Sequence, residues 1–259
     1  MVNAVVLEAQ GRIDPVLDVA VARKAWAMVR ESFGMKPDGT ARLITDPSAQ
    51  SKVGLNARPT WSLSLNAGSA AGWCVNDRTC AATCVVEHGG NARYDSVRVA
   101  RQARGALLLQ HPDAFATLLA RDVEWARAKG WVFGRPNTNS DVAWERVFPW
   151  LFDMTAAYDY TKRLDRVGWV APTYRVTYSA TAATREATVR RVVERGDTVT
   201  MVFPIGKKAD MIREWRGIPV IDGDVSDFRF GDPDGVIVGL RAKAGLRGLA
   251  SHPLLSSVA

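Results

Sequence analysis

The sequence predicts an α/β protein in which parallel strands and outer helices form a partial or complete βα barrel, with an open doubly wound sheet as the second architecture. Three observations lead to this prediction. Short apolar segments with strand patterning alternate with amphipathic segments of helical period along most of the chain. At least six such strands follow Thr60, and strand–helix alternation is typical of a parallel sheet. The length of 259 residues suits a single barrel.

The predicted elements follow one another in a regular order. Residues 1–58 are predicted to be an N-terminal extension, with a helix over 16–33 and a loop over 36–59 that is rich in Gly, Pro and polar residues. Strands are expected over residues 61–65, 131–135, 157–160, 174–178, 198–203, 218–221 and 236–240. Helices are expected over residues 97–129 with a break at Pro112, and over 142–152, 184–195 and 207–215. Residues 59–248 thus form the predicted barrel-like domain, and residues 249–259 are expected to be a flexible tail.

The chain lacks the signals of a membrane or secreted protein. No apolar run approaches the roughly 20 residues of a membrane-spanning helix. The first residues, MVNAVVLEAQGRID, lack the basic, apolar and small-residue sections of a secretory signal. We therefore expect a cytoplasmic protein with no membrane partner, whose oligomeric state the sequence does not indicate.

The net charge is +7, and most of the basic side chains are arginines. Eight of them gather in two groups, at positions 93, 98, 101 and 104 and at positions 185, 190, 191 and 195. Such a basic surface suits DNA or RNA, because basic side chains release counterions from a polyanion. A GC-rich genome that encodes arginine in place of lysine explains the same composition, so both interpretations stay open.

All three cysteines lie within eleven residues of a predicted loop over residues 66–91. Cys74, Cys80 and Cys84 form the pattern C-x5-C-x3-C, and His88 extends it by the same spacing. A disulfide would leave one cysteine over, and disulfides are rare in the cytoplasm. The pattern predicts a bound metal. Either the three thiolates hold a 4Fe–4S cluster with one open iron, or His88 completes a zinc site; His88 also fits a solvated loop histidine.

Polar residues follow the predicted strands at the edge where α/β proteins bind their ligands. Two carboxylates after one strand can divide acid and base roles or bind a divalent cation. Basic and amide groups there can hold a carboxylate or phosphate. Ser140 and Asp141 also resemble the N-cap of the helix that follows. The candidate catalytic residues are Asp141, Lys162, Asp222 and Asp224, and the candidate cofactor-binding residues are Asn66, Arg135, Asn137 and Arg241.

A three-cysteine loop directly after the first barrel strand resembles the radical-SAM superfamily. In that family such a loop binds a 4Fe–4S cluster, whose open iron takes the amino and carboxyl groups of S-adenosylmethionine. The resemblance implies that Cys74, Cys80 and Cys84 are the cluster ligands. Their spacing differs from the usual C-x3-C-x2-C of the family.

A second resemblance covers roughly residues 60–245 and is to uncharacterised barrel-like proteins of actinobacterial phages and plasmids. It rests on the segments WSLSL at 61–65, RPN at 135–137, SD at 140–141, WE at 144–145, YDYTK at 158–162, VIDGD at 220–224 and GVIVGLRAK at 235–243. Together the resemblances imply a bacteriophage enzyme that acts on a nucleic acid or nucleotide. The alternatives are a zinc-stabilised nucleic-acid-binding protein, a transglycosylase that exchanges bases in DNA or tRNA, and a non-enzymatic phage accessory protein.

Overall fold

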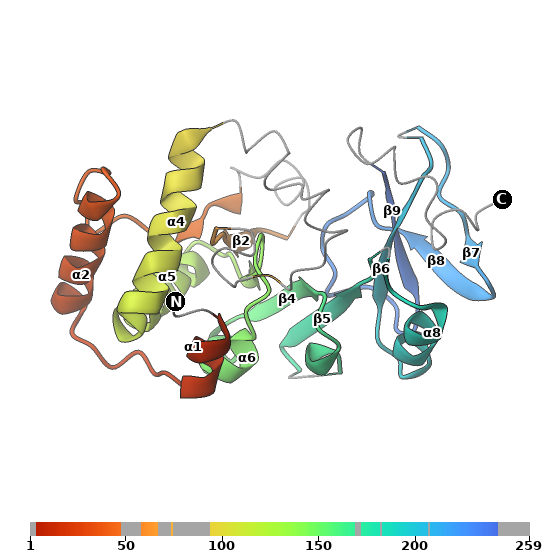
Figure 1. The fold of residues 1–259 in the computed structure, drawn as a ribbon, viewed down its shortest axis with the longest axis horizontal. Coiled ribbons are helices and arrows are strands. Elements are labelled where there is room, and N and C mark those ends of the chain that lie inside the picture. Colours follow the sequence, from red (N-terminus) through yellow and green to blue (C-terminus); the bar gives the residue numbers. More distant parts are fainter. Residues whose placement is uncertain are drawn as a thin grey trace.

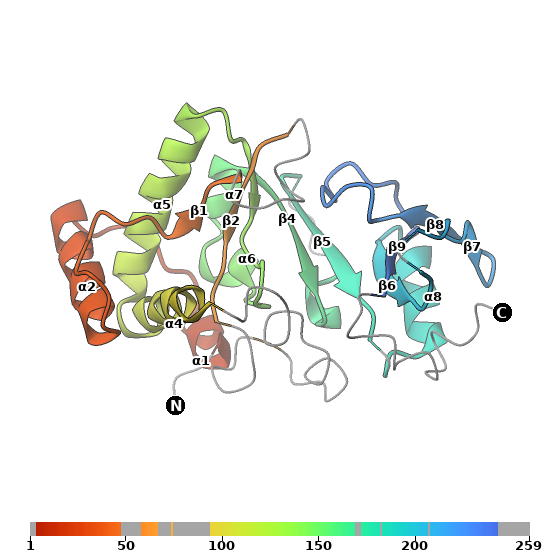
Figure 2. The ribbon, with the colours of Figure 1, turned by 90° about the horizontal axis from the view of Figure 1, so that it is seen from above.

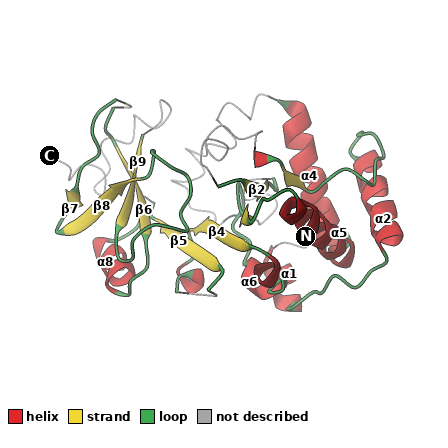
Figure 3. Ribbon diagram, turned by 180° about the vertical axis from the view of Figure 1, so that it is seen from behind, coloured by secondary structure: helices red, strands yellow, loops and turns green. Residues whose placement is uncertain are grey.

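The computed structural model describes residues 4–47, 58–66, 74, 94–168, 172–181, 183–206 and 208–242. Figure 1 shows that the chain runs from a helix-rich N-terminal half to a strand-rich C-terminal half, and Figure 3 shows the same division from behind. The predicted tail, residues 249–259, lies outside the described residues.

The described part of the chain contains a nine-stranded sheet with the order β1-β2-β3-β4-β5-β6-β9-β8-β7. Only the edge pairs β1–β2 and β7–β8 are antiparallel. The strands are β1 (Ile44–Thr45), β2 (Thr60–Leu63), β3 (Phe133–Arg135), β4 (Ala156–Thr161), β5 (Tyr174–Ser179), β6 (Val199–Phe203), β7 (Glu214–Trp215), β8 (Ile218–Asp222) and β9 (Ile237–Arg241). This mostly parallel sheet with helices confirms the predicted α/β class.

Local sequence explains where two of the helices begin. The Asp18 carboxylate accepts hydrogen bonds from the backbone N–H groups of Ala20 and Val21, which caps the first turn of α2. Pro112 starts α5, where its missing N–H costs nothing. The helices are α1 (Ala4–Gln10), α2 (Val19–Ser32), α4 (Asp95–Gln110), α5 (Pro112–Ala128), α6 (Trp144–Val147), α7 (Leu151–Met154), the 3-10 helix η4 (Leu164–Arg166) and α8 (Glu186–Glu194).

Three predicted segments differ from the structure. The helix predicted over 207–215 is wrong, because residues 208–213 are not helical and residues 214–215 form β7. Arg216 and Gly217 have φ of 51° and 83° and turn the chain directly into β8, as both central residues of a tight hairpin do. The helix predicted over 142–152 is divided into α6 and α7 around Pro149, and β1 lies inside the segment predicted as a loop.

The prediction was a partial or complete barrel, and the barrel is not confirmed because the sheet does not close. In the described residues β1 and β7 are edge strands, and the order reverses after β6, where β9 inserts. The β4 side chains alternate between two faces of the sheet, here called the Asp159 face and the Tyr160 face. The connection between β8 and β9 covers the Tyr160 face: Phe228 packs edge-on against Phe133 of β3 (ring centroids 4.8 Å apart) and Tyr158 of β4 (5.6 Å). This connection therefore occupies the space that would be the interior of a barrel.

Two apolar cores hold the sheet and helices together. The larger core lies between the strands from β2 through β5 and the N-terminal helices. In this core, Phe115 of α5 stacks on Trp144 and Phe148 at centroid distances of 6.1 and 5.9 Å. The smaller core joins β6, β8 and β9 with α8. Seen from above, α2, α4 and α5 gather at the β1–β2 edge and α8 lies beside β6 (Figure 2). The burial of apolar surface between the sheet and these helices drives this arrangement.

The described parts of residues 1–58 pack against the rest of the chain. α2 lies against α4 and α5, and β1 extends the sheet beside β2. The Asp122 carboxylate of α5 fixes the start of β1 by accepting hydrogen bonds from the backbone N–H groups of Leu43 (2.6 Å) and Ile44 (3.4 Å). Burial raises the pKa of Asp122 to about 6, against the opposing effect of these two hydrogen bonds.

The raised pKa of Asp122 predicts a specific pH dependence of stability. Because the folded state binds this proton more tightly than the unfolded chain, the contribution of Asp122 is fully present below about pH 4 and is lost as the pH rises to about 6. The free energy of unfolding of the wild type should therefore fall by about 2 kcal/mol relative to Asp122→Asn between pH 4 and pH 7. Urea denaturation at both pH values measures the difference.

The matched control for this experiment is Asp113→Asn, an exposed carboxylate in the first turn of the same helix. It should leave the pH dependence of the wild type unchanged between pH 4 and pH 7. If the Asp122→Asn variant shows the same pH dependence as the wild type, the carboxylate of Asp122 titrates normally in the folded protein and the stated effect of burial is wrong.

Candidate functional site

All eight candidate catalytic and cofactor-binding residues lie in the described part of the chain. Arg135 ends β3, Lys162 follows β4, and Asn66 lies three residues beyond β2. The structure gathers the other five candidate residues into two separate groups. One group is a buried network on the Asp159 face, and the second lies at the ends of β8 and β9.

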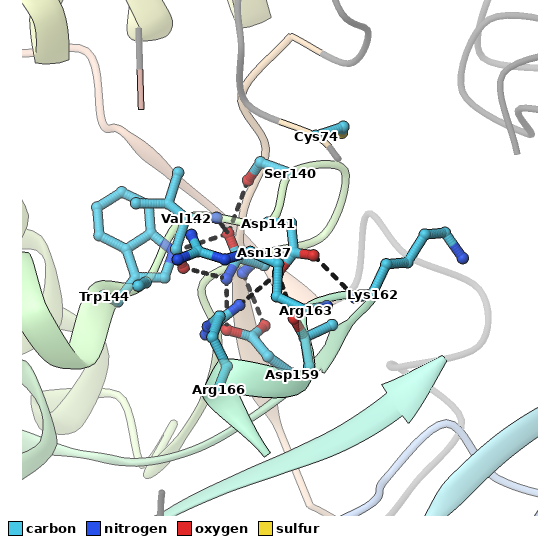
Figure 4. Close-up of polar contacts among 12 residues, drawn as sticks. Cys74, Asn137, Ser140, Asp141, Val142, Trp144, Asp159, Lys162, Arg163 and Arg166 are labelled. Atoms are coloured by element: carbon cyan, nitrogen blue, oxygen red, sulfur yellow. Dashed lines mark hydrogen bonds and ion pairs between the residues drawn. The ribbon is translucent and has the colours of Figure 1, made fainter. Parts of the chain in front are cut away.

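Asn137 organises the loop after β3 (Figure 4). Its backbone N–H and its side-chain amide donate to the two oxygens of the Asp159 carboxylate at 2.8 and 2.9 Å. Its Oδ1 accepts from the Ser140 hydroxyl, the Val142 backbone and the Trp144 indole, and its amide also donates to the Val142 carbonyl. The side chain is 3 % exposed, so its polar atoms are committed to the protein interior. The N-cap interpretation of Ser140 is wrong, since α6 starts at Trp144 and Ser140 binds Asn137 instead.

Asp141 belongs to a buried ion network centred on Arg166. The Arg166 guanidinium is fully buried and donates to Asp141 (2.6 Å) and to both oxygens of Glu145 (2.9 and 3.0 Å). Asp141 also accepts from the Thr161 hydroxyl (2.7 Å) and from the backbone N–H of Lys162 (2.8 Å). Asp141 thereby fixes the backbone at the end of β4.

Tyr174 links this network to Asp159. Its hydroxyl accepts from Arg166 and donates to Asp159, both at 2.7 Å. Burial raises the pKa of Asp159 to about 7, although Arg166 and the Tyr174 hydroxyl favour the charged form. Arg166, Glu145, Asp159 and Tyr174 were not among the predicted site residues. The alternation along YDYT could have marked Asp159 as facing the same side as the buried Ala157.

The second group joins three of the candidate residues. Arg241 donates through two nitrogens to the two oxygens of Asp222, each at 2.8 Å, in a bidentate pair. Its backbone N–H and its guanidinium both contact Asp224, at 2.8 and 3.3 Å. The hydrogen bonds that Arg241 donates to the Asp222 carboxylate raise the pKa of Arg241 above its usual value. The carboxylates predicted to act as acid and base thus share one guanidinium.

A third set of polar residues lies on the Tyr160 face, at the C-terminal ends of β3, β4 and β5. Arg135 pairs with Asp227 of the β8–β9 connection, and its guanidinium carbon lies 4.9 Å from the centre of the Tyr160 ring. The Lys162 ammonium donates to the Ser179 hydroxyl at 3.1 Å. We call these five residues the rim cluster. In Figure 4 the Lys162 side chain extends away from the buried network to which its backbone binds.

Of the four predicted metal ligands, Cys74 lies among the described residues, whereas Cys80, Cys84 and His88 lie outside them. The Cys74 Sγ lies 3.5 Å from the carbonyl oxygen of Asn139, in the loop that follows β3. Within the described ranges, no three His, Cys, Asp or Glu side chains come together in a way that could hold a metal ion. The predicted cysteine ligation therefore stays a prediction.

The two arginine groups are partly exposed and partly buried: Arg98, Arg185, Arg191 and Arg195 are exposed, and Arg93 lies outside the described residues. Arg101 is buried, and Arg104 is partly buried with a 3.4 Å hydrogen bond to the Ser64 carbonyl. Burial and the neighbouring Arg101 lower the pKa of Arg104 to about 10. Arg190 in the second group pairs with Glu186 at 2.7 Å. No helix in the described segments is long and apolar enough to cross a membrane.

Comparison with known proteins identifies one family. The model of the family described as Gene product 88 matches residues 32–252, a range that includes every strand of the sheet. Searches among curated proteins and among solved structures found no match. The family match agrees with the resemblance to phage proteins, and it spans well over half of the chain. The protein therefore belongs to the Gene product 88 family, a family of phage-type proteins.

Proposed function

We propose that this protein is a phage-type enzyme of the host cytoplasm that binds a metal ion or an iron–sulfur cluster through its cysteine loop. We further propose that it acts on a nucleotide or nucleic acid at the C-terminal ends of the parallel strands. The observation that carries the proposal is the position of Cys74, whose Sγ lies 3.5 Å from the Asn139 carbonyl just beyond β3. Because parallel strands end at one edge of a sheet, this cysteine lies at the same edge as the rim cluster.

The chemistry of the donor set fits a metal. Three thiols within eleven residues suit zinc or iron, and the proposed ligands are Cys74, Cys80 and Cys84, with His88 as the fourth ligand of a zinc site. Metal binding would deprotonate the Cys74 thiol and so remove its contact with the Asn139 carbonyl. A 4Fe–4S cluster with S-adenosylmethionine would supply radical chemistry, whereas a closed zinc site would be structural.

The other candidate residues have different proposed roles. Asp141 positions the end of β4 through the backbone of Lys162, and Asn137 positions the loop after β3. Asp222 and Asp224 remain the candidate acid and base, and Arg241 holds both carboxylates in place. Arg135 and Asn66 lie at the strand ends as candidate groups for holding the cofactor.

The net charge of +7 favours a second candidate, a zinc-stabilised nucleic-acid-binding protein or base-exchanging transglycosylase. This candidate predicts one zinc per chain, no colour, and DNA or RNA binding that weakens steeply as salt is raised. Binding that is unchanged from low to high salt argues against it. A chain with no metal that tolerates Cys→Ser changes at all three positions fits the non-enzymatic accessory protein.

Metal and sulfide content of protein purified without oxygen tests the main proposal. We expect iron with a broad absorption band near roughly 400 nm, and we expect Cys74→Ala to lose most of both. His88→Ala separates the two metals, since it should retain an iron–sulfur cluster held by cysteines but lose a zinc that needs the imidazole. Thermal denaturation shows whether each variant is folded. Absence of both iron and zinc from the folded wild type contradicts the proposal.

A further inference from the structure

We infer that Lys162 and Ser179 bind a phosphate group of the substrate, on the Tyr160 face of the sheet. The inference rests on the proposed function in taking a nucleotide or nucleic acid as the ligand, and it names the part of that ligand which this edge of the sheet recognises. Three features of the described residues support it: the pairing of these two side chains, the lack of a described carboxylate paired with the Lys162 ammonium, and a row of hydroxyl groups on the neighbouring strands.

The sheet itself brings the two side chains together. β4 and β5 are parallel, with Thr161 beside Tyr178. The next residues, Lys162 and Ser179, therefore lie side by side and point to the same face. The Lys162 Nζ donates to the Ser179 Oγ at 3.1 Å, and both residues are partly buried. A ligand at the end of these strands would meet the ammonium and the hydroxyl together.

Lys162 differs from four arginines that lie at or just after the ends of the strands. Each of those guanidinium groups pairs with a carboxylate: Arg135 with Asp227, Arg163 with Glu8, Arg166 with Asp141, and Arg241 with Asp222. The contact found for the Lys162 ammonium is a neutral hydroxyl. A partly buried charge that has no counter-ion among the described residues is costly. An anionic ligand would supply the missing negative charge.

Hydroxyl groups continue the row onto the next strand. Thr200 of β6 lies beside Ser179 in the register of β5 and β6, and it is 4 % exposed. Its Oγ1 is buried without a hydrogen-bond partner, which is uncommon for a buried polar atom. Two residues before Ser179 and Thr200, the hydroxyls of Thr177 and Thr198 form a hydrogen bond with each other at 3.0 Å. Lys162, Ser179 and Thr200 thus offer donors from three adjacent strands.

These donors suit a phosphate better than a carboxylate. A carboxylate is matched best by the planar fork of arginine, and the strand-end guanidinium groups are already engaged with carboxylates. A lysine acts as a point charge, and a phosphate accepts from several donors that approach from different directions. The combination of one ammonium with hydroxyls from neighbouring strands fits the second geometry.

Calorimetric titration with inorganic phosphate at low ionic strength tests the inference. We expect Lys162→Met to weaken binding by about tenfold or more, because it removes a charged donor, and Ser179→Ala by a few-fold. The matched control is Lys129→Met, an exposed lysine at the C-terminal end of α5, which leads into the opposite end of β3. It should bind phosphate as the wild type does. Thermal denaturation confirms that each variant is folded.

The outcomes separate this inference from the proposed function. Equal phosphate affinity for Lys162→Met and Lys129→Met overturns the inference, and so does acetate binding that is as tight and as dependent on Lys162 as phosphate binding. Metal content is measured on the same samples. Phosphate binding that depends on Lys162 in a protein without metal supports the inference while removing the metal from the proposed function. Phosphate binding that does not depend on Lys162, in a protein that contains metal, overturns the inference and leaves the metal in the proposed function.

Discussion

Replacement of Arg166 by methionine is expected to destabilise the protein by about 3–5 kcal/mol. The Arg166 side chain is fully buried and donates to Asp141 at 2.6 Å and to Glu145 at 2.9 Å. Methionine fills similar space but leaves two buried carboxylates without their counter-charge. The loss should exceed that of any exposed ion pair, since water would not resolvate these groups without opening the fold. Urea denaturation followed by tryptophan fluorescence measures the change in the free energy of unfolding.

Two further variants make the Arg166 experiment specific. Arg98→Met removes an exposed ion pair with Asp95 (3.0 Å) within the first turn of α4, and it should change stability by less than about 0.5 kcal/mol. Adding Glu145→Gln to Arg166→Met removes one of the stranded charges and should restore part of the loss. A loss below about 1 kcal/mol in Arg166→Met would show that the network does not depend on the charge of this guanidinium.

The secondary structure was largely predictable because its signals are local. The alternation of apolar and polar residues predicted β2, and Pro112 predicted the boundary between α4 and α5. The helix predicted over 207–215 failed because helical spacing in a short segment cannot be told from a strand and a turn. The hairpin turn uses Arg216 with positive φ, which a non-glycine residue rarely adopts. No pattern in the neighbouring sequence indicated this turn.

The candidate site was predictable as a list of strand-end residues but not as an arrangement. Asn137 and Asp141 were identified correctly as polar residues after β3, yet the structure commits them to Asp159 and Arg166 inside the protein. Whether a loop side chain turns inward depends on partners that are distant in the sequence, such as Arg166, 25 residues from Asp141. Bidentate pairing of Arg241 with Asp222 is also a product of strand order, which places β9 beside β8.

The second large effect concerns Phe228 in the β8–β9 connection. Phe228 is 9 % exposed, and its ring lies 4.8 Å from Phe133 and 5.6 Å from Tyr158 between centroids. Phe228→Ala is expected to cost about 3–5 kcal/mol, because it removes a large buried ring and leaves a cavity against β3 and β4. Urea denaturation gives the loss, and hydrogen exchange shows whether residues 223–236 open first.

The control lies three residues away in the same connection. Val225 is 80 % exposed, so Val225→Ala should leave stability within about 0.5 kcal/mol of the wild type. Phe228→Leu keeps most of the buried area and should lose less than Phe228→Ala. Since Asp227 adjoins Phe228 and pairs with Arg135, opening of the connection should also detach Asp227 from the rim cluster. If Phe228→Ala is as stable as Val225→Ala, the connection does not hold the Tyr160 face.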